Sequence, residues 1–229
     1  MNIKELLEQK GRIFIIPIDH PMGFDTPKLQ LKGKQNFINE VDNFNQDGYI
    51  FHSYDYTKNP FKTKKDFFLT VGELPDNYKL DIEKLKTFPE VKNVTIYFDV
   101  NGVKDEEPYK FYKDYVFELK KQGYFVMAMA FPSDELEEDI NNYIHTIDIA
   151  SRLGCDALKT HFFTGIEKLD LKGMYLFIGG GDLIVDESEF DSFIGKVGDL
   201  KIASYSFGRN IFEADNYVER INKITGIIN

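Results

Sequence analysis

The chain has 229 residues, of which 42% are hydrophobic and 29% charged, and its 21 Phe and 13 Tyr supply the bulk for a large core. This composition is typical of a folded, soluble protein and excludes a disordered chain. The formal net charge of −10 repels phosphates at long range, so we expect no binding to nucleic acid and none to a membrane.

No stretch approaches the roughly 18 consecutive apolar residues of a membrane span, and the first residues do not begin a signal peptide. The single cysteine, Cys155, cannot form an internal disulfide. These features predict a cytoplasmic protein.

Short apolar segments alternate with helical patterns along the whole chain. The predicted strands lie at residues 13–18, 48–52, 67–71, 94–100, 124–130, 155–159, 174–178 and 200–203. Helical spacing of apolar residues predicts helices near 37–44, 112–119, 134–152, 187–195 and 214–225, and glycines end two of them, Gly123 and Gly154.

Strands that are apolar on both faces and alternate with helices are typical of a parallel sheet covered by helices. Eight such strand–helix units, in a chain close to the roughly 250 residues of a closed barrel, favour closure over an open sheet. We therefore predict an α/β fold, a (β/α)₈ TIM barrel that forms a single domain over residues 1–229.

In such a barrel the active site lies at the C-terminal ends of the strands. Taken in chain order, the residues at these ends are Asp19 and His20, His52 to Tyr54, Asp99 and Asn101, Phe131, Lys159 to His161, Gly179 to Gly181, and Ser204 to Arg209.

Lys159 is the most informative of these residues. It follows Ala157 and Leu158 without a run of charges, so we expect its amine to lie in a confined, partly desolvated space. Burial lowers the pKa of a lysine, and the neutral amine attacks a carbonyl to give an imine. The alternative is a structural lysine that pairs with Asp99 or Asp156 or reaches solvent.

Glycines follow the last two predicted strands. Gly179, Gly180 and Gly181 allow backbone N–H groups to approach a ligand, and Gly208 with Arg209 offers further amides and a guanidinium. Barrels often bind phosphate at the loops after strands 7 and 8. Together the two groups predict a phosphate site.

The histidines and the cysteine carry less information. His20, His52 and His161 follow three different strands, but no spacing typical of metal ligands accompanies them, so we expect no metal and no cofactor. His145 lies within a predicted helix and Cys155 at the start of a strand, and both are expected to be structural.

Four segments occur in the order of a known family. They are Ile16 to His20, Gly154 to Thr160, Ile178 to Gly181 and Gly208 to Phe212. Together they resemble the archaeal-type class I fructose-bisphosphate aldolases and their relatives, the aminodideoxyheptulosonate synthases and the autoinducer-2 thiolase, over about the whole chain.

The resemblance implies a Schiff base on Lys159, assistance from Asp19, and a substrate phosphate held by Gly179 to Gly181, Gly208 and Arg209. It thus implies a lyase that cleaves or forms a carbon–carbon bond in a phosphorylated ketose or ketone, and relatives often form homo-oligomers.

Two positions depart from the family. A Tyr-Pro-Arg-Gly stretch carries the family's acid/base tyrosine, whereas this chain has Phe131, Pro132, Ser133 and Asp134. Proton transfer must then come from another group, for which His20, His161 and Tyr54 are the candidates. The second departure is Asp182, which stands where a lysine is common.

These departures leave two alternatives to the aldolase. One is a synthase or acyl-transfer enzyme that keeps the lysine with a different partner. The other, favoured by Phe131, is a catalytically reduced protein that binds a phosphorylated metabolite.

Overall fold

The computed structural model describes residues 2–20, 26–73, 78–99, 106–132 and 140–228. The strands within these residues are β1 (Phe14–Pro17), β2 (Gly48–His52), β3 (Asp66–Glu73), β4 (Tyr78–Lys79), β5 (Asn93–Asp99), β6 (Phe125–Phe131), β7 (Ala157–His161), β8 (Tyr175–Gly179) and β9 (Ala203–Ser206).

The helices within the same residues are α1 (Ile3–Lys10), α2 (Pro27–Lys32), α3 (Lys34–Val41), α4 (Ser53–Lys58), α5 (Ile82–Lys86), α6 (Glu106–Lys121), α7 (Ile140–Leu153), a 3₁₀ helix (Ile166–Lys168), α8 (Glu187–Gly198), α9 (Arg209–Phe212) and α10 (Tyr217–Ile228). Five of the described α-helices, α1, α2, α4, α5 and α9, were not predicted from the sequence. The expected start of α7, with its cap at Ser133, lies outside the described residues.

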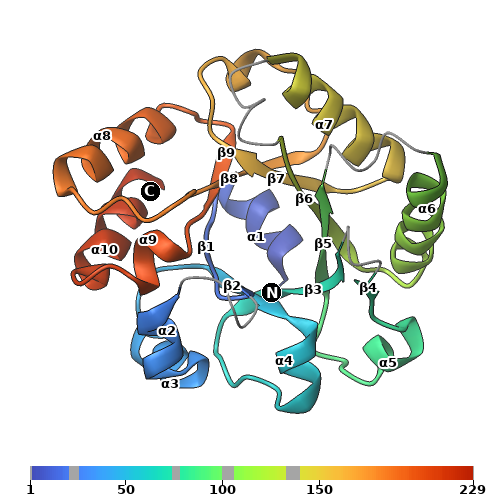
Figure 1. Ribbon diagram of the computed structural model, residues 1–229, viewed down its shortest axis with the longest axis horizontal. Helices are drawn as coiled ribbons and strands as arrows, with labels where there is room; N and C mark the ends of the chain where they lie inside the picture. Colours follow the sequence, from blue (N-terminus) through green and yellow to red (C-terminus); the bar gives the residue numbers. More distant parts are fainter. Residues whose placement is uncertain (1, 21–25, 74–77, 100–105, 133–139, 229) are drawn as a thin grey trace. The chain divides into compact units, whose positions relative to one another are not determined.

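The strands form one hydrogen-bonded sheet in the order β2-β1-β9-β8-β7-β6-β5-β3-β4, and β2 also pairs with β3. With this additional pairing, the strand order is that of a closed barrel of eight parallel strands. The short β4 adds an antiparallel strand beside β3 (Figure 1). The predicted (β/α)₈ TIM barrel is thereby confirmed.

The chain divides into two compact units, residues 1–67 with 178–229 (unit 1) and residues 68–177 (unit 2). In unit 1, β1 pairs in parallel with β2 and with β9, with Ile15 opposite Gly48 and Phe14 opposite Tyr205. In unit 2, β5 lies between β3 and β6, and β6 pairs with β7. The single domain over residues 1–229 stays a prediction.

The strands are buried along almost their whole length, as expected for strands covered on both faces. Gly154 follows α7 directly and Gly123 lies two residues after the end of α6, with φ of +85° and +87° respectively. A side chain is strained in this left-handed conformation, so glycine there ends each helix without cost. Both predictions are confirmed.

The eighth strand differs from its prediction, because it spans residues 203–206 instead of 200–203. Helix α8 continues to Gly198, and turn hydrogen bonds from Leu200 N to Val197 O and from Ala203 N to Leu200 O carry the chain onward. Lys201 and Ile202 are exposed in this turn. The apolar pattern at residues 200–203 therefore covers a turn and only the first residue of the strand.

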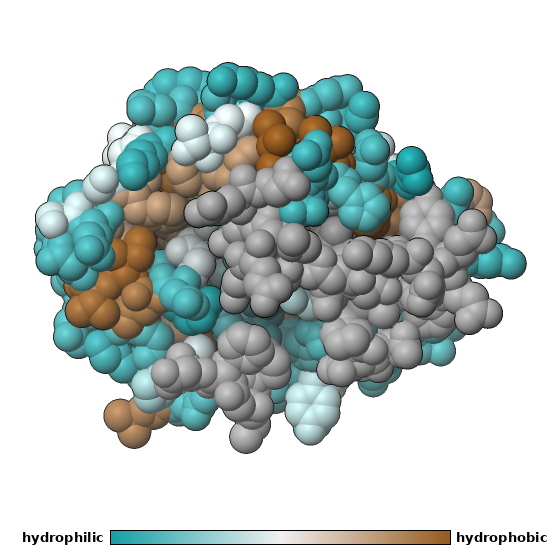
Figure 2. Space-filling view, turned by 45° about the horizontal axis from the view of Figure 1, so that its top comes forward, coloured by the Kyte–Doolittle hydropathy of each residue, from teal (hydrophilic) through white to brown (hydrophobic). Residues whose placement is uncertain are grey.

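On the face shown in Figure 2, hydrophilic side chains cover most of the coloured surface, and hydrophobic side chains gather in a few smaller patches. Within the described residues, none of the helices has the length and apolar character needed to cross a bilayer.

Candidate active site

Lys159 belongs to a row of side chains that crosses three neighbouring strands of unit 2. In the parallel register, Lys159 on β7 lies opposite Met129 on β6, and Met129 lies opposite Tyr97 on β5. Residues paired in this way project from the same face of a sheet. Tyr97, Met129 and Lys159 therefore share one face, and we call them the lysine row.

The buried amine of Lys159 lies near two apolar side chains. The residue is 7% exposed, its Nζ lies 4.0 Å from Met129 Sδ, and the same atom lies 6.0 Å from the centroid of the Phe131 ring. The amine thus does not reach solvent in the manner of a surface lysine. Asp156, one of its expected structural partners, instead pairs with Lys120 and accepts from Val126 N at 2.9 Å.

Phe131 and His161 lie two residues further along the same strands. Their ring centroids are 4.6 Å apart, and the Tyr97 ring lies 6.1 Å from that of Phe131. The aromatic ring without a hydroxyl therefore sits in contact range of an imidazole and near a phenol. Sequence reasoning missed Tyr97 because it falls inside a predicted strand, although its position two residues before Asp99 places it on the same strand face as the strand end.

In unit 1, Asp19 and His20 follow β1, and both side chains are less than one-fifth exposed. His20 Nδ1 lies 4.0 Å from Asp19 Oδ1, and the His20 ring meets the Phe212 ring edge-on at 5.3 Å. The carboxylate and the imidazole thus lie close together, at an ion-pair distance longer than a hydrogen bond.

Gly208 lies between β9 and α9 in the chain and packs against the end of β1. A Cβ at this position would lie 2.6 Å from Pro17 O and 3.1 Å from His20 Cε1, so only glycine allows this approach. Gly180 is similarly close to Phe207, and its N–H donates to Ser206 O at 3.3 Å. Gly179 ends β8, and Gly181 has a φ of +65°. Of the four glycines of the predicted phosphate site, Gly180 and Gly208 are thus closely packed against neighbouring atoms, and Gly181 has a left-handed backbone conformation.

Arg209 forms an ion pair with Asp182, the residue that departs from the family pattern. The Asp182 side chain is 89% exposed and that of Arg209 29% exposed. The predicted phosphate-binding cation therefore has an internal anionic partner.

Two residues that sequence reasoning left without a role hold the loop between β8 and α8. Asn210 is fully buried; its Nδ2 donates to Gly180 O and Asp182 O, and its Oδ1 accepts from Ile184 N, all at 2.8 Å. The Asn210 side chain thus fixes the backbone on both sides of Asp182.

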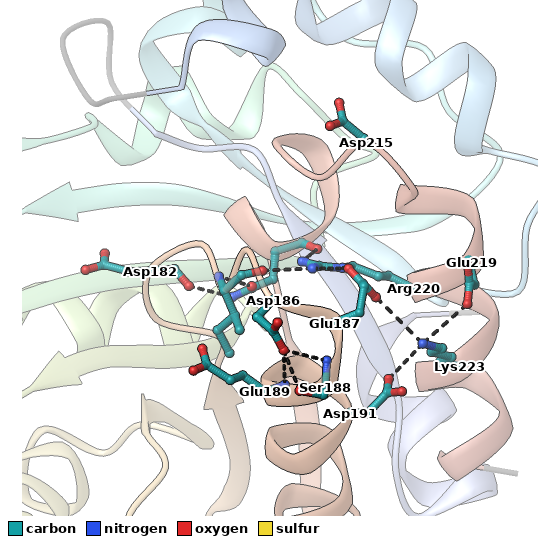
Figure 3. Close-up of polar contacts among 12 residues, drawn as sticks. Asp182, Asp186, Glu187, Ser188, Glu189, Asp191, Asp215, Glu219, Arg220 and Lys223 are labelled. Atoms are coloured by element: carbon teal, nitrogen blue, oxygen red, sulfur yellow. Dashed lines mark hydrogen bonds and ion pairs between the residues drawn. The ribbon is translucent and has the colours of Figure 1, made fainter.

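Arg220, on α10, is the second such residue and is 1% exposed. Its guanidinium donates to Ile184 O at 2.8 Å and to Asn210 O at 3.2 Å, and its Nε donates to Glu187 at 2.9 Å (Figure 3). Hydrogen bonding from Arg220 lowers the pKa of Glu187. No sequence signal marks Arg220, because a lone arginine in a helix is usually exposed.

The remaining candidates are Tyr54, His52, His145 and Cys155. Tyr54 is 57% exposed, with Lys58 Nζ over its ring, and His52 accepts from Tyr54 N at 3.0 Å as a helix cap. His145 is exposed on α7. Burial raises the pKa of the Cys155 thiol to about 12, which leaves it unreactive near neutral pH. Among the described residues, no cluster of three or more His, Cys, Asp or Glu is arranged to hold a metal.

The chain matches no protein-family model, and no curated protein matches it significantly. Its fold is similar to that of several solved structures. One is a Schiff-base-forming fructose-1,6-bisphosphate aldolase studied through its reaction intermediates, with a TM-score of 0.82, 14% identity and 99% of each chain covered.

Two further structures are archaeal fructose-1,6-bisphosphate aldolases. One has a TM-score of 0.81 at 15% identity, and the other, with its catalytic lysine covalently bound to the carbinolamine intermediate, has 0.82 at 14%; each comparison covers 98% of both chains. At these identities the likeness establishes the fold. The predicted resemblance to archaeal-type class I aldolases is confirmed at that level.

Proposed function

We propose that this chain is a class I aldolase-type lyase that cleaves or forms a carbon–carbon bond in a phosphorylated keto compound through a Schiff base on Lys159. The observation that carries the proposal is the buried position of Lys159 beside Met129 and Phe131, in a fold similar to that of Schiff-base aldolases. In general, burial favours the neutral form of an amine, and the neutral amine is the nucleophile in imine formation.

The proposed reaction begins when Lys159 Nζ attacks the ketone carbon and water leaves, which gives an iminium. The iminium withdraws electrons as the carbon–carbon bond breaks, so an aldehyde departs and an enamine remains on the lysine. Protonation and hydrolysis release the second product, and the reverse sequence builds the bond. Asp19, His20 and His161 are the proposed proton carriers of imine formation and hydrolysis.

The substrate phosphate is proposed to bind at Gly179 to Gly181, Gly208 and Arg209. The close packing of Gly208 and the tight turns at Gly180 and Gly181 support this role, because they leave backbone near the ends of β8 and β9 without side chains. The proposed partners are this small molecule and further copies of the chain, and the proposed location is the cytoplasm.

Borohydride trapping tests the imine. The protein is incubated with a panel of phosphorylated ketones and ketoses, reduced with borohydride, and analysed by peptide mass spectrometry. We expect the mass of the reduced ligand on Lys159, and its loss in Lys159→Ala. Lys168→Ala, at an exposed lysine of the same unit, is the matched control and should trap as the wild type does.

Absence of an adduct with every carbonyl compound would contradict the Schiff base. The position of Phe131, next to His161 and Lys159, favours one second candidate, a protein that binds a phosphorylated metabolite without turnover. Trapping at Lys159 without retro-aldol products would support that candidate or the acyl-transfer enzyme over the lyase.

A further inference from the structure

The proposed lyase needs a group that removes and returns a proton during the carbon–carbon step, and Phe131 has no hydroxyl with which to do so. The inference below rests on the proposed function. It concerns the lysine row of unit 2, because that row places a phenol on the same sheet face as the proposed nucleophile.

Tyr97 and Lys159 are separated by one strand. Neighbouring strands lie about 4.8 Å apart, so the two Cα atoms are roughly 10 Å from each other. The side chain between them, Met129, reaches Lys159 Nζ through its sulfur at 4.0 Å. Long side chains on the same face at this spacing can both reach a small molecule bound between their ends.

The Tyr97 ring also borders the position where the resembled family has its tyrosine. Its centroid lies 6.1 Å from that of Phe131, with the planes inclined by 34°, and Tyr97 is half-buried. A phenol thus lies near Phe131, but it belongs to β5 and not to β6. Tyr54, the tyrosine that the sequence suggested, is 57% exposed, and Lys58 Nζ lies over its ring.

We propose that Tyr97 is the acid–base residue of the carbon–carbon step. In cleavage, the Tyr97 phenolate takes the proton from the substrate hydroxyl β to the iminium carbon. The bond between the hydroxyl-bearing carbon and the carbon next to the iminium carbon then breaks. Its electron pair forms the enamine double bond, and the iminium nitrogen becomes neutral. The Tyr97 hydroxyl then returns the proton to the enamine carbon, which restores the iminium for hydrolysis.

The iminium itself favours this cycle. Its positive charge is fixed once the imine forms, and a nearby positive charge stabilises a phenolate. The proton that Tyr97 accepts is the one it later donates, so the step consumes no further reactant.

Dihydroxyacetone phosphate separates imine formation from proton transfer. The protein is incubated with it in D₂O, exchange of the carbon-bound hydrogen next to the carbonyl is followed by NMR, and borohydride adducts at Lys159 are quantified in parallel. For Tyr97→Phe we expect trapping within about 2-fold of wild type and exchange slower by about 100-fold or more, the usual contribution of general acid–base catalysis.

Tyr175→Phe is the matched control, because it removes a phenol of the same unit at the start of β8, and it should leave both readouts unchanged. Circular dichroism and the retained trapping establish that Tyr97→Phe is folded. Exchange at the wild-type rate in Tyr97→Phe, or equal losses of trapping and exchange, would overturn the role of Tyr97. Failure of the wild type to trap the ketone would overturn both this inference and the proposed Schiff base. The outcomes named above, with trapping intact in the wild type, would overturn the role of Tyr97 alone.

Discussion

Asp182 and Arg209 form an ion pair at the proposed phosphate site, and the pair sets a cost on the binding of any anion there. A phosphate that takes the guanidinium must displace the carboxylate or bind beside its charge. The Asn210 bonds to the backbone of Gly180, Asp182 and Ile184 hold Asp182 in place, so the carboxylate cannot move away with its loop at no cost.

We therefore expect Asp182→Asn to bind inorganic phosphate more tightly than the wild type. An exposed pair contributes about 0.2–1 kcal/mol, which corresponds to roughly 1.5- to 5-fold in affinity. Isothermal titration calorimetry at low ionic strength measures the change.

Asp215→Asn controls for net charge, because Asp215 is another exposed partner of a basic side chain in unit 1, with Lys28 Nζ at 2.6 Å. An equal gain in Asp215→Asn would mean that only the overall charge matters. The gain should also vanish when Arg209 is replaced by Gln, and its persistence there would contradict a role for the pair.

At the scale of the elements, the turn from β9 into α9 depends on Gly208. A methyl group there would overlap Pro17 O and press on His20 and Phe212. Overpacking of this kind typically costs about 1–3 kcal/mol, so Gly208→Ala should lower the free energy of unfolding by that amount in urea titrations.

Gly195→Ala is the opposite case and serves as its control. Gly195 lies within α8, and an added Cβ there would have no atom within 4 Å. Alanine in a helix interior is favoured over glycine by about 0.8–1 kcal/mol, so this variant should be more stable than the wild type. A Gly208→Ala protein as stable as the wild type would contradict the packing described for the turn.

The sequence predicted elements well where one face or two faces of an element are uniformly apolar. Helices α6, α7 and α8 and seven of the eight barrel strands lie where apolar spacing placed them, and Gly123 and Gly154 end helices because their conformation is unfavourable for other residues. The displaced β9 shows the limit, since apolar residues of a turn and of a strand look alike in one dimension.

The candidate site was harder to predict from the sequence than the elements were, for a different reason. The positions of Lys159, Asp19 and Arg209 at predicted strand ends made them candidates. Which residues share a sheet face depends on the strand register, and the register depends on pairing between distant segments. Tyr97 becomes a candidate only through the register of β5 with β6, which places it opposite Met129. Arg220 and Asn210 act through backbone carbonyls and amides, which leave no pattern in the sequence.

At the scale of the whole molecule, the bond from Arg220 to Glu187 links stability to pH. It lowers the pKa of Glu187 in the folded protein below the value near 4.3 of an unfolded chain. The pair therefore stabilises the fold above about pH 4.3, and this contribution is lost as the pH falls through the folded pKa.

Glu187→Gln should accordingly be less stable than the wild type at pH 7, and the difference should shrink between pH 5 and pH 3. Urea unfolding at a series of pH values measures it. Glu189→Gln, at an exposed carboxylate of the same helix turn, is the comparison and should not reproduce this change. A pH-independent difference for Glu187→Gln would contradict the linkage.

The pairing of β1 with β9 has a consequence for the order of events during synthesis. These strands are joined by residues about 190 positions apart, as the bond from Ile13 N to Ser204 Oγ illustrates. Unit 2 is one continuous segment, residues 68–177, whereas unit 1 draws on both ends of the chain. A ribosome therefore delivers every residue of unit 2 before residues 178–229 of unit 1 exist. β1 must wait, with one edge unpaired, until β9 has been synthesised.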